Sequence, residues 1–226
     1  MRRNPFSIII LFVFFFSQNT FAQISVGIKT GINFADANID GIANNYLPNA
    51  EVYTGFSVGI VAEIPMLHGF SFRPELNYIE KGFQSMEDFG ITQWDIQVGA
   101  GVKTRLQYIE APLLMKFSQG NDLAKFYVIA GPNVSYAVDG WVRPVVRAVI
   151  DFTLPRNDLH LSNDIYRRWE ISATGGIGGE VKAGGGKIFA DVRYTQGFSN
   201  ILDNPIVDIK IRNQGFGLNV GYAYNF

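Results

Sequence analysis

Cysteine is absent from the 226 residues, so the chain forms no disulfide and has no thiolate to hold a metal. Histidine is scarce, with only His68 and His160. Neither lies beside a serine on a predicted strand face, and no histidine or carboxylate cluster has the spacing of metal ligands. The glycine runs at residues 175–179 and 184–187 match neither a dinucleotide-binding nor a phosphate-binding motif. We therefore expect no catalytic residues, no cofactor and no metal site.

An excess of charge of one sign is also missing. The chain has 19 Lys and Arg residues against 20 Asp and Glu residues, which leaves a formal net charge of -1. A nucleic-acid-binding surface needs a basic patch, and no such patch or acidic tail is visible. We expect no nucleic-acid partner.

Long hydrophobic runs are missing after the first residues. Arg2 and Arg3 precede an apolar run over residues 8–16, and a polar stretch then ends in small residues at Ala22. This pattern predicts a cleaved signal peptide over residues 1–22 and a mature domain over residues 23–226. The alternative is a membrane anchor, but the run is roughly half of the ~20 residues that a spanning helix needs.

The composition is nevertheless rich in apolar residues, at 47%, in aromatic residues, at 14%, and in glycine, with 24 copies. These residues alternate strictly with polar residues along the chain. In residues 24–34 the even positions are mainly Ile and Val, whereas the odd positions are Ser, Gly, Lys and Asn. A strand of 9 to 11 residues with this period of two can face lipid on one side and a polar interior on the other.

Eight segments alternate in this way, and they predict an all-β, closed antiparallel transmembrane β-barrel of about eight strands in an up-and-down meander. They are residues 24–34, 55–64, 70–81, about 102–117, 125–136, 169–181, 188–194 and 215–226.

The links between them alternate in length. Three are short (65–69, 118–123 and 183–187), and four are long (35–53, 84 to about 102, 137–168 and 199–213). Residues 98–106 could belong either to the fourth strand or to the link before it. Short periplasmic turns and long external loops are typical of outer-membrane barrels. An open sheet would leave unpaired backbone groups in lipid, so we expect the first and last strands to pair.

Ten charged residues fall on the polar side of these segments, and both signs are present. They are Lys29, Glu63, Arg73, Glu75, Glu110, Lys116, Glu170, Glu180, Asp191 and Arg193. A barrel of eight strands has a lumen just wide enough to be filled by side chains. We expect a packed polar core in which these charges pair and are structural, and the alternative is a narrow conducting path or a binding site.

The link over residues 137–168 carries a hydrophobic stretch between prolines, at residues 142–154. It is either a β extension beyond the membrane or a surface that meets a partner. We favour the extension, because loops of this length usually carry structure of their own.

Several of these segments resemble the PorT-like family of outer-membrane β-barrel proteins, also described as the porin-family β-barrel domain. The resemblance is carried by GIKTGINF (27–34), GFSVGIVAEIP (55–65), FRPELNYIEKG (72–82), YIEAPLLMKF (108–117), FYVIAGPNVSY (126–136), DVRYTQGFSNI (191–201) and LNVGYAYNF (218–226). It implies a protein integral to the bacterial outer membrane, in contact with its lipid, and no catalytic residues. One member of that family serves a secretion system. Tyr222, Tyr224 and Phe226 look like the carboxy-terminal signal that the barrel-assembly machinery reads, and they also suit an interfacial aromatic girdle.

Three functions are compatible with these observations. The first is a non-enzymatic barrel with a structural or interaction role, as an accessory to a secretion or envelope complex. The second is a narrow channel or small-ligand binder. The third is a lipid-modifying membrane enzyme, which has the least support because the two histidines have no serine partner.

Overall fold

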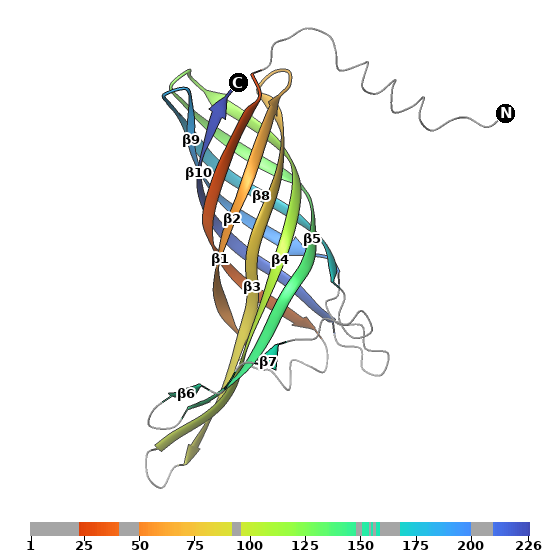
Figure 1. Ribbon diagram of the computed structural model, residues 1–226, viewed down its shortest axis with the longest axis vertical. Coiled ribbons are helices and arrows are strands. Elements are labelled where there is room, and N and C mark those ends of the chain that lie inside the picture. The colour runs from red at the N-terminus through yellow and green to blue at the C-terminus, as the bar shows by residue number, and fades with distance from the viewer. Residues whose placement is uncertain are drawn as a thin grey trace, which may run out of the picture.

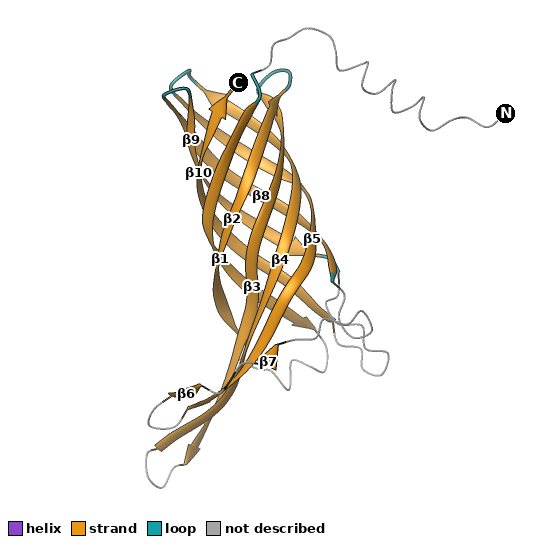
Figure 2. Cartoon of the chain, viewed as in Figure 1, coloured by secondary structure: helices purple, strands orange, loops and turns teal. Residues whose placement is uncertain are grey.

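The structure, a computed structural model, describes residues 23–40, 50–91, 96–147, 151–153, 155, 157–158, 168–199 and 210–226. The predicted signal peptide, residues 1–22, and His160 lie outside these residues. All regular structure in the described part is β-strand (Figures 1 and 2). The strands are β1 (Ser25–Asp40), β2 (Ala50–Pro65), β3 (Phe70–Ile91), β4 (Ile96–Gly120), β5 (Ala124–Arg147), β6 (Asp151–Thr153), β7 (Asn157–Asp158), β8 (Trp169–Ala183), β9 (Gly186–Gly197) and β10 (Lys210–Asn225).

Eight of these strands close into an antiparallel barrel, as predicted. Neighbours follow the order β4-β3-β2-β1-β10-β9-β8-β5, and a ladder between β4 and β5 completes the circle. The first and last strands pair along their whole length, from Ser25 opposite Asn225 to Asp40 opposite Lys210. Closure leaves the wall without an unpaired edge, which is the condition for a sheet to stand in hydrocarbon.

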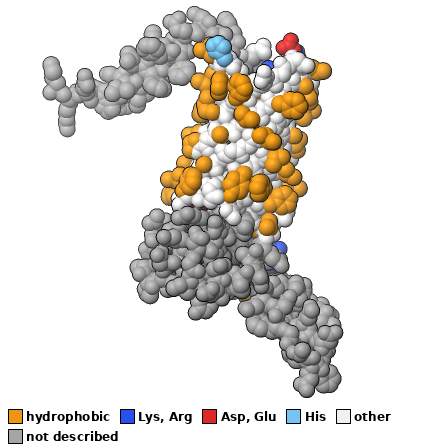
Figure 3. Space-filling view, turned by 180° about the vertical axis from the view of Figure 1, so that it is seen from behind, with side chains coloured by type: hydrophobic (Ala, Val, Ile, Leu, Met, Phe, Trp, Pro, Cys, Tyr) orange, Lys and Arg blue, Asp and Glu red, His pale blue; other side chains and the backbone are white. Residues whose placement is uncertain are grey.

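The wall has two chemically different faces. Large apolar side chains point outward and are exposed, for example Ile28 (68%), Phe126 (82%) and Ile177 (65%). Figure 3 shows such side chains over the wall of the barrel. The residues between them in the sequence point inward and are mostly polar or charged. A protein in water does not expose so many apolar side chains on every strand, so this surface fits a lipid environment. Among the described residues, no helix has the length and hydropathy to span a membrane.

One end of the barrel, the short-turn end, carries the turns at residues 66–69, 121–123 and 184–185 together with the carboxy terminus (Figure 1). At the other end, the extension end, β3, β4 and β5 continue beyond the barrel. The short strands β6 and β7 pair with β5 there. The β extension favoured for residues 137–168 is therefore present in the described residues.

The long link predicted from residue 84 to about residue 102 is mostly strand, and residues 98–106, which the sequence assigned either to the strand or to the loop, belong to β4. β3 continues to Ile91 and β4 begins at Ile96, and the two pair from Met86 opposite Gly101 to Ile91 opposite Ile96. Likewise β1 extends to Asp40, and β10 begins at Lys210. Outside the hydrocarbon neither face of a ladder has to be apolar, so these strand ends lack the alternation on which the prediction depended.

Candidate functional site

The barrel interior gathers most of the buried charged groups. All ten predicted interior charges are buried, with exposed fractions between 0% for Lys116 and 8% for Glu180. Alternation brings them inward, because every second residue of a strand points to the same face. They fall into three layers along the barrel, which we name the short-turn layer, the central layer and the extension-side layer.

The short-turn layer consists of Glu63 (β2), Lys116 (β4), Glu180 (β8) and Lys187 (β9). Lys116 is fully buried and donates to both oxygens of Glu63, at 3.0 and 2.9 Å. It also donates to Glu180. Lys187 lies 2.8 Å from Glu63 and 3.1 Å from Glu180. Each carboxylate therefore meets two ammonium groups, and four strands are joined across the lumen.

The central layer consists of Lys29 (β1), Arg73 and Glu75 (β3), and Asp191 and Arg193 (β9). Glu75 is its hub. Lys29 Nζ lies 2.6 Å from Glu75 Oε2, and Arg73 Nε lies 3.0 Å from Oε1. Arg193 binds both oxygens of Glu75, at 2.8 and 2.9 Å, and both oxygens of Asp191, at 2.6 and 3.0 Å. Paired, bidentate contacts of this kind are what makes a buried charge tolerable.

The extension-side layer consists of Lys81 (β3), Glu110 (β4) and Glu170 (β8). Lys81 Nζ lies 2.6 Å from Glu110 and donates to Glu170 at 3.3 Å. Neutral donors satisfy the remaining carboxylate oxygens. Ser135 Oγ donates to Glu110 at 3.0 Å, and Asn213 Nδ2 donates to Glu170 at 2.6 Å. Five strands thus meet in this layer.

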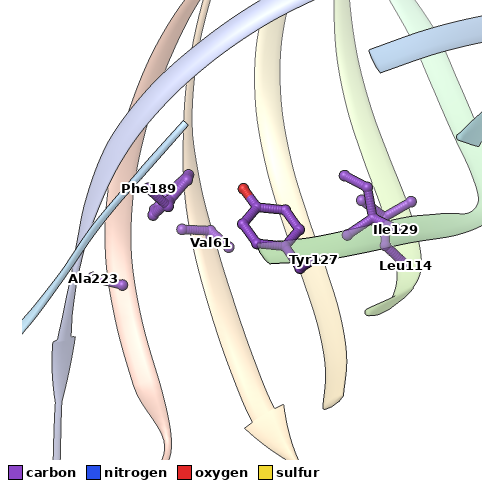
Figure 4. Packing of buried hydrophobic residues seen from close by; sticks show 6 residues of the cluster. All are labelled: Val61, Leu114, Tyr127, Ile129, Phe189 and Ala223. Atoms are coloured by element: carbon purple, nitrogen blue, oxygen red, sulfur yellow. The ribbon is translucent and has the colours of Figure 1, made fainter. Parts of the chain in front are cut away.

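The interior is not wholly polar, which corrects the expectation of a packed polar core. A cluster of buried apolar residues lies among the charges: Val61, Leu114, Tyr127, Ile129, Phe189 and Ala223. In Figure 4, the Tyr127 ring projects between Val61 and Phe189 on one side and Leu114 and Ile129 on the other. The Arg73 guanidinium lies over the Phe189 ring at 4.3 Å, and the Lys116 ammonium lies over Tyr127 at 4.4 Å. Aromatic rings therefore separate the short-turn layer from the central layer and interact with cations of both.

Inward-facing glycines make room for these rings. A Cβ at Gly178 would lie 2.4 Å from Tyr127 Cζ, and a Cβ at Gly221 would lie 2.4 Å from Phe189 Cζ. By contrast, a Cβ at the outward-facing neighbour Gly179 would meet nothing closer than 3.7 Å. The interior is packed so tightly that no side chain larger than the hydrogen atom of glycine fits at Gly178 or Gly221.

Sequence reasoning missed two members of the layers, Lys81 and Lys187. Lys81 was placed at the last residue of a strand, and Lys187 was placed in a turn. Both have the inward parity of residues already assigned, since Lys81 follows Arg73 and Glu75 by even steps and Lys187 precedes Asp191 in the same way. Extending the alternation through the strand ends would have found them.

The three layers close the lumen. A cavity of about 620 Å³ opens at the short-turn end, and its innermost lining includes Glu63, Glu180 and Lys187. A cavity of only about 40 Å³ lies between the central and extension-side layers, and a second of about 20 Å³ is lined by Lys81 and Glu110 of the extension-side layer. Cavities of this size have room for a few water molecules and not for a solute. The layers contain six cations and six carboxylates, so the filled interior has no net charge.

The other residues singled out in the sequence, the carboxy-terminal aromatic residues and His68, lie away from the interior. Tyr222, Tyr224 and Phe226 are on the outer face of β10 or just beyond it, with exposed fractions of 38%, 49% and 73%. The Tyr224 and Phe226 rings contact each other at 5.1 Å. His68 is exposed in the turn before β3 and has a positive φ of 58°. No group of three potential metal ligands occurs in the described part of the chain.

Comparison with solved structures finds outer-membrane barrels of low sequence identity. Neisserial surface protein A is 14% identical, with 89% of this chain and 97% of that chain covered and a TM-score of 0.45. OprG from Pseudomonas aeruginosa is 10% identical, with 90% and 94% covered and a TM-score of 0.35. The outer membrane protease OmpT from Escherichia coli is 9% identical, with 90% and 97% covered and a TM-score of 0.37. No match is found among curated proteins.

The family assignment rests on a different comparison. Residues 16–203 match the family described as "Outer membrane protein beta-barrel domain". That range covers most of the chain and seven of the eight barrel strands in full, together with the start of the predicted mature domain. The closed antiparallel barrel and its apolar outer face agree with the match. The chain therefore belongs to the outer membrane protein beta-barrel domain family and is a barrel of the bacterial outer membrane.

Proposed function

We propose that this protein is a non-enzymatic, closed barrel that anchors an external β extension in the outer membrane and presents it to a secretion or envelope complex. The observation that carries the proposal is the filled interior. Three layers of paired charges and an aromatic cluster occupy the lumen, so the barrel offers a rigid support rather than a passage. The PorT-like resemblance of the strands agrees with an accessory role in secretion.

The extension is well suited to present a surface. Short turns of outer-membrane barrels face the periplasm, so the extension end faces outward from the cell. β3, β4 and β5 have 22, 25 and 24 residues, although a tilted strand needs only about 9 to 11 to cross the membrane. Ladder pairing continues through this excess length, from Lys103 opposite Arg143 to Gly99 opposite Arg147. A continuous ladder transmits the rigidity of the barrel to the extension.

Removal of the β3–β4 tip tests the interaction role. In the variant, residues 86–101 are deleted, and Ser85 and Val102, which face each other in the ladder, are joined by an Asn-Gly turn. We expect mild crosslinking in whole cells to join an envelope protein to the intact chain and not to the variant. The deletion shortens β3 and β4 only in the extension and leaves their paired residues within the barrel in place, so the variant should keep the gel mobility of a folded barrel before heating. Recovery of the same crosslinked partner with both proteins would contradict the proposal.

A narrow channel is the second candidate, favoured by the cavity of about 620 Å³ at the short-turn end. Single-channel recording in planar bilayers separates the two. We expect the purified protein to produce no reproducible conductance steps, because the layers leave interior cavities of only about 40 and 20 Å³. Stable steps of uniform size, absent when a heat-denatured sample is added, would remove the closed-barrel proposal and favour the channel.

A further inference from the structure

An apolar groove crosses the lipid-facing wall of the barrel. It has a volume of about 730 Å³ and runs from β4 over β5, β8 and β9 to β10, which are neighbours in the wall. One side of the groove is a row of exposed residues that pair directly from strand to strand: Val128, Ile177, Val192 and Leu218. The next outward position of β8 is Gly179, which has no side chain to fill the space. We name this feature the Gly179 groove.

The packing of the barrel itself does not require a glycine at position 179. A Cβ there would lie 3.7 Å from the nearest atom, the backbone oxygen of Lys125, which is an ordinary van der Waals distance. The ladders from β8 to β5 and to β9 pass Gly179 without a register shift, and its φ is not positive. A glycine inside a strand weakens the strand, and it often marks a place where another molecule approaches closely.

An exposed aromatic side chain lies beside the Gly179 groove. Phe126 is directly opposite Gly179 in the β5–β8 ladder and is 82% exposed, the highest value among the large hydrophobic residues that the structure describes. An aromatic ring often covers a glycine opposite it, but no atom of Phe126 lies within 4 Å of the Cβ position of Gly179. The ring therefore projects from the wall and leaves the groove of its own chain open.

Phe126 also differs from the aromatic residues around it. Most of the other described rings on the outer face pack in pairs, namely Phe56–Tyr78, Phe70–Phe117, Tyr136–Trp169, Tyr194–Phe216 and Tyr224–Phe226. Phe126 belongs to none of these pairs. An aromatic ring that packs against a matching surface is more stable than one that projects alone, so Phe126 is available to an external surface.

The positions of Phe126 and Gly179 fit a second copy of the chain. They lie side by side at about 5 Å, the separation of directly opposed residues in a ladder, and therefore at nearly the same depth in the membrane. Two copies inserted in the same direction can be related by a two-fold axis along the membrane normal. An axis in front of β5 and β8 sets β5 of each copy against β8 of the other. Both rings then meet a groove at once, as in an isologous interface.

A phenylalanine ring matches the Gly179 groove better than an acyl chain does. Acyl chains are flexible and cover any apolar wall, so they need no groove of fixed shape. A rigid ring gains dispersion contacts only where the opposing surface is complementary. Lipid tails are as apolar as the protein, so association in a membrane depends on close packing at small residues. We propose that the protein forms a two-fold dimer in the outer membrane, in which Phe126 of each copy packs into the Gly179 groove of the other.

Disulfide crosslinking in outer membranes tests this interface. The chain has no cysteine, so an introduced cysteine is its only thiol. Two differently tagged copies are coexpressed, one with Phe126→Cys and the other with Gly179→Cys. We expect mild oxidation to join the two copies. The control combines Ile28→Cys with Ile60→Cys, which are also directly opposed but belong to β1 and β2 on the opposite side of the barrel. The control should give no crosslinked product.

Two further variants measure the packing without introduced thiols. Gly179→Leu fills the groove, and Phe126→Ala removes the ring. We expect each to weaken dimerisation about tenfold or more, as measured by single-molecule photobleaching in lipid bilayers, because a ring anchored in a pocket contributes a large share of such an interface. Ala62→Leu adds the same side chain to the outer face of β2 and should leave dimerisation unchanged. All three variants should keep the gel mobility of a folded barrel.

Three outcomes would overturn the proposal. The first is equal crosslinking of the control pair, which would indicate random collision in the membrane. The second is a dimer that persists in both Gly179→Leu and Phe126→Ala. The third is a monomer that retains a phospholipid in native mass spectrometry and loses it in Gly179→Leu, which would assign the groove to an acyl chain. Phe126→Ala introduces no larger side chain, so it decides the matter if Gly179→Leu folds poorly.

Discussion

Glu75→Gln should destabilise the barrel more than any other single substitution of an interior charge, by about 5 kcal/mol. Glu75 meets three cations in the central layer: Lys29 at 2.6 Å, Arg73 at 3.0 Å and Arg193 at 2.8 and 2.9 Å. An amide keeps the size of the side chain and removes its charge, which leaves three buried cations with Asp191 as their only carboxylate. Equilibrium unfolding by urea in detergent micelles, followed by gel mobility and tryptophan fluorescence, measures the effect.

Asp122→Asn is the matched control for Glu75→Gln. Asp122 is an exposed carboxylate in the turn between β4 and β5 and has no ion pair among the described residues. An exposed substitution of this kind changes stability by about 0.5 kcal/mol or less. Equal unfolding midpoints for Glu75→Gln and Asp122→Asn would show that Glu75 does not hold the three cations together.

Glu110→Leu should cost about 3 kcal/mol, a smaller effect because part of the network survives. Lys81 loses the carboxylate at 2.6 Å but keeps Glu170 at 3.3 Å. Ser135 also loses the acceptor of its hydroxyl group. Resistance to heat unfolding in detergent should fall, and the urea midpoint should fall with it.

A double-mutant cycle gives the Glu110 prediction a sharper form. Glu110→Leu/Lys81→Met, made in a Glu170→Gln background so that Glu170 is not left as a buried carboxylate without its cation, replaces both members of the pair by apolar residues of similar length and leaves no unpaired charge in this layer. Replacing a whole buried pair in this way is often neutral. We therefore expect the double variant to recover most of the stability that Glu110→Leu loses. If the two substitutions are simply additive, Lys81 and Glu110 are not coupled, and the extension-side layer is misassigned.

The sequence predicted the wall of the barrel better than its ends. Residues in contact with hydrocarbon must be apolar while their neighbours in the sequence point inward. The alternation in Ile24–Phe34 and Trp169–Val181 therefore predicts the barrel parts of β1 and β8. The extension has no such constraint on either face, and for this reason residues 84–102 looked like a loop although most of them are strand. Alternation appears where one face of a strand contacts lipid and the other contacts a polar interior. It does not indicate whether a segment is paired in a sheet.

The same alternation predicted only part of what fills the lumen. Charged residues on an otherwise apolar chain are conspicuous, and all ten that were predicted to face inward are buried. Tyr127 and Phe189 also point inward, as the parity of their strands predicts, but parity does not indicate which side chains they meet across the lumen. Their role became evident only from their packing against Arg73 and Lys116.

The ladder pair of Lys103 and Arg143 shows the same limit from another direction. Lys103 and Arg143 are 40 positions apart, and their opposition depends on the β4–β5 register, which shifts by one residue between Gln107 and Tyr108. A bulge of this kind moves every later pairing along the two strands. Residue types alone did not indicate that two cations would face each other there.

By itself the sequence determined that eight segments alternate, that ten of the twelve charges in the layers lie on the inner face, and that the chain forms a closed barrel in a membrane. These properties are local, because they follow from the period of two along each strand and the need of the backbone to be paired in lipid. Only the tertiary structure decided that Glu75 meets Lys29 and Arg193, that Glu63 and Glu180 share two lysines, and that an aromatic cluster separates the layers. Those contacts join strands far apart in the chain, so they depend on the register of every ladder around the barrel and on its closure.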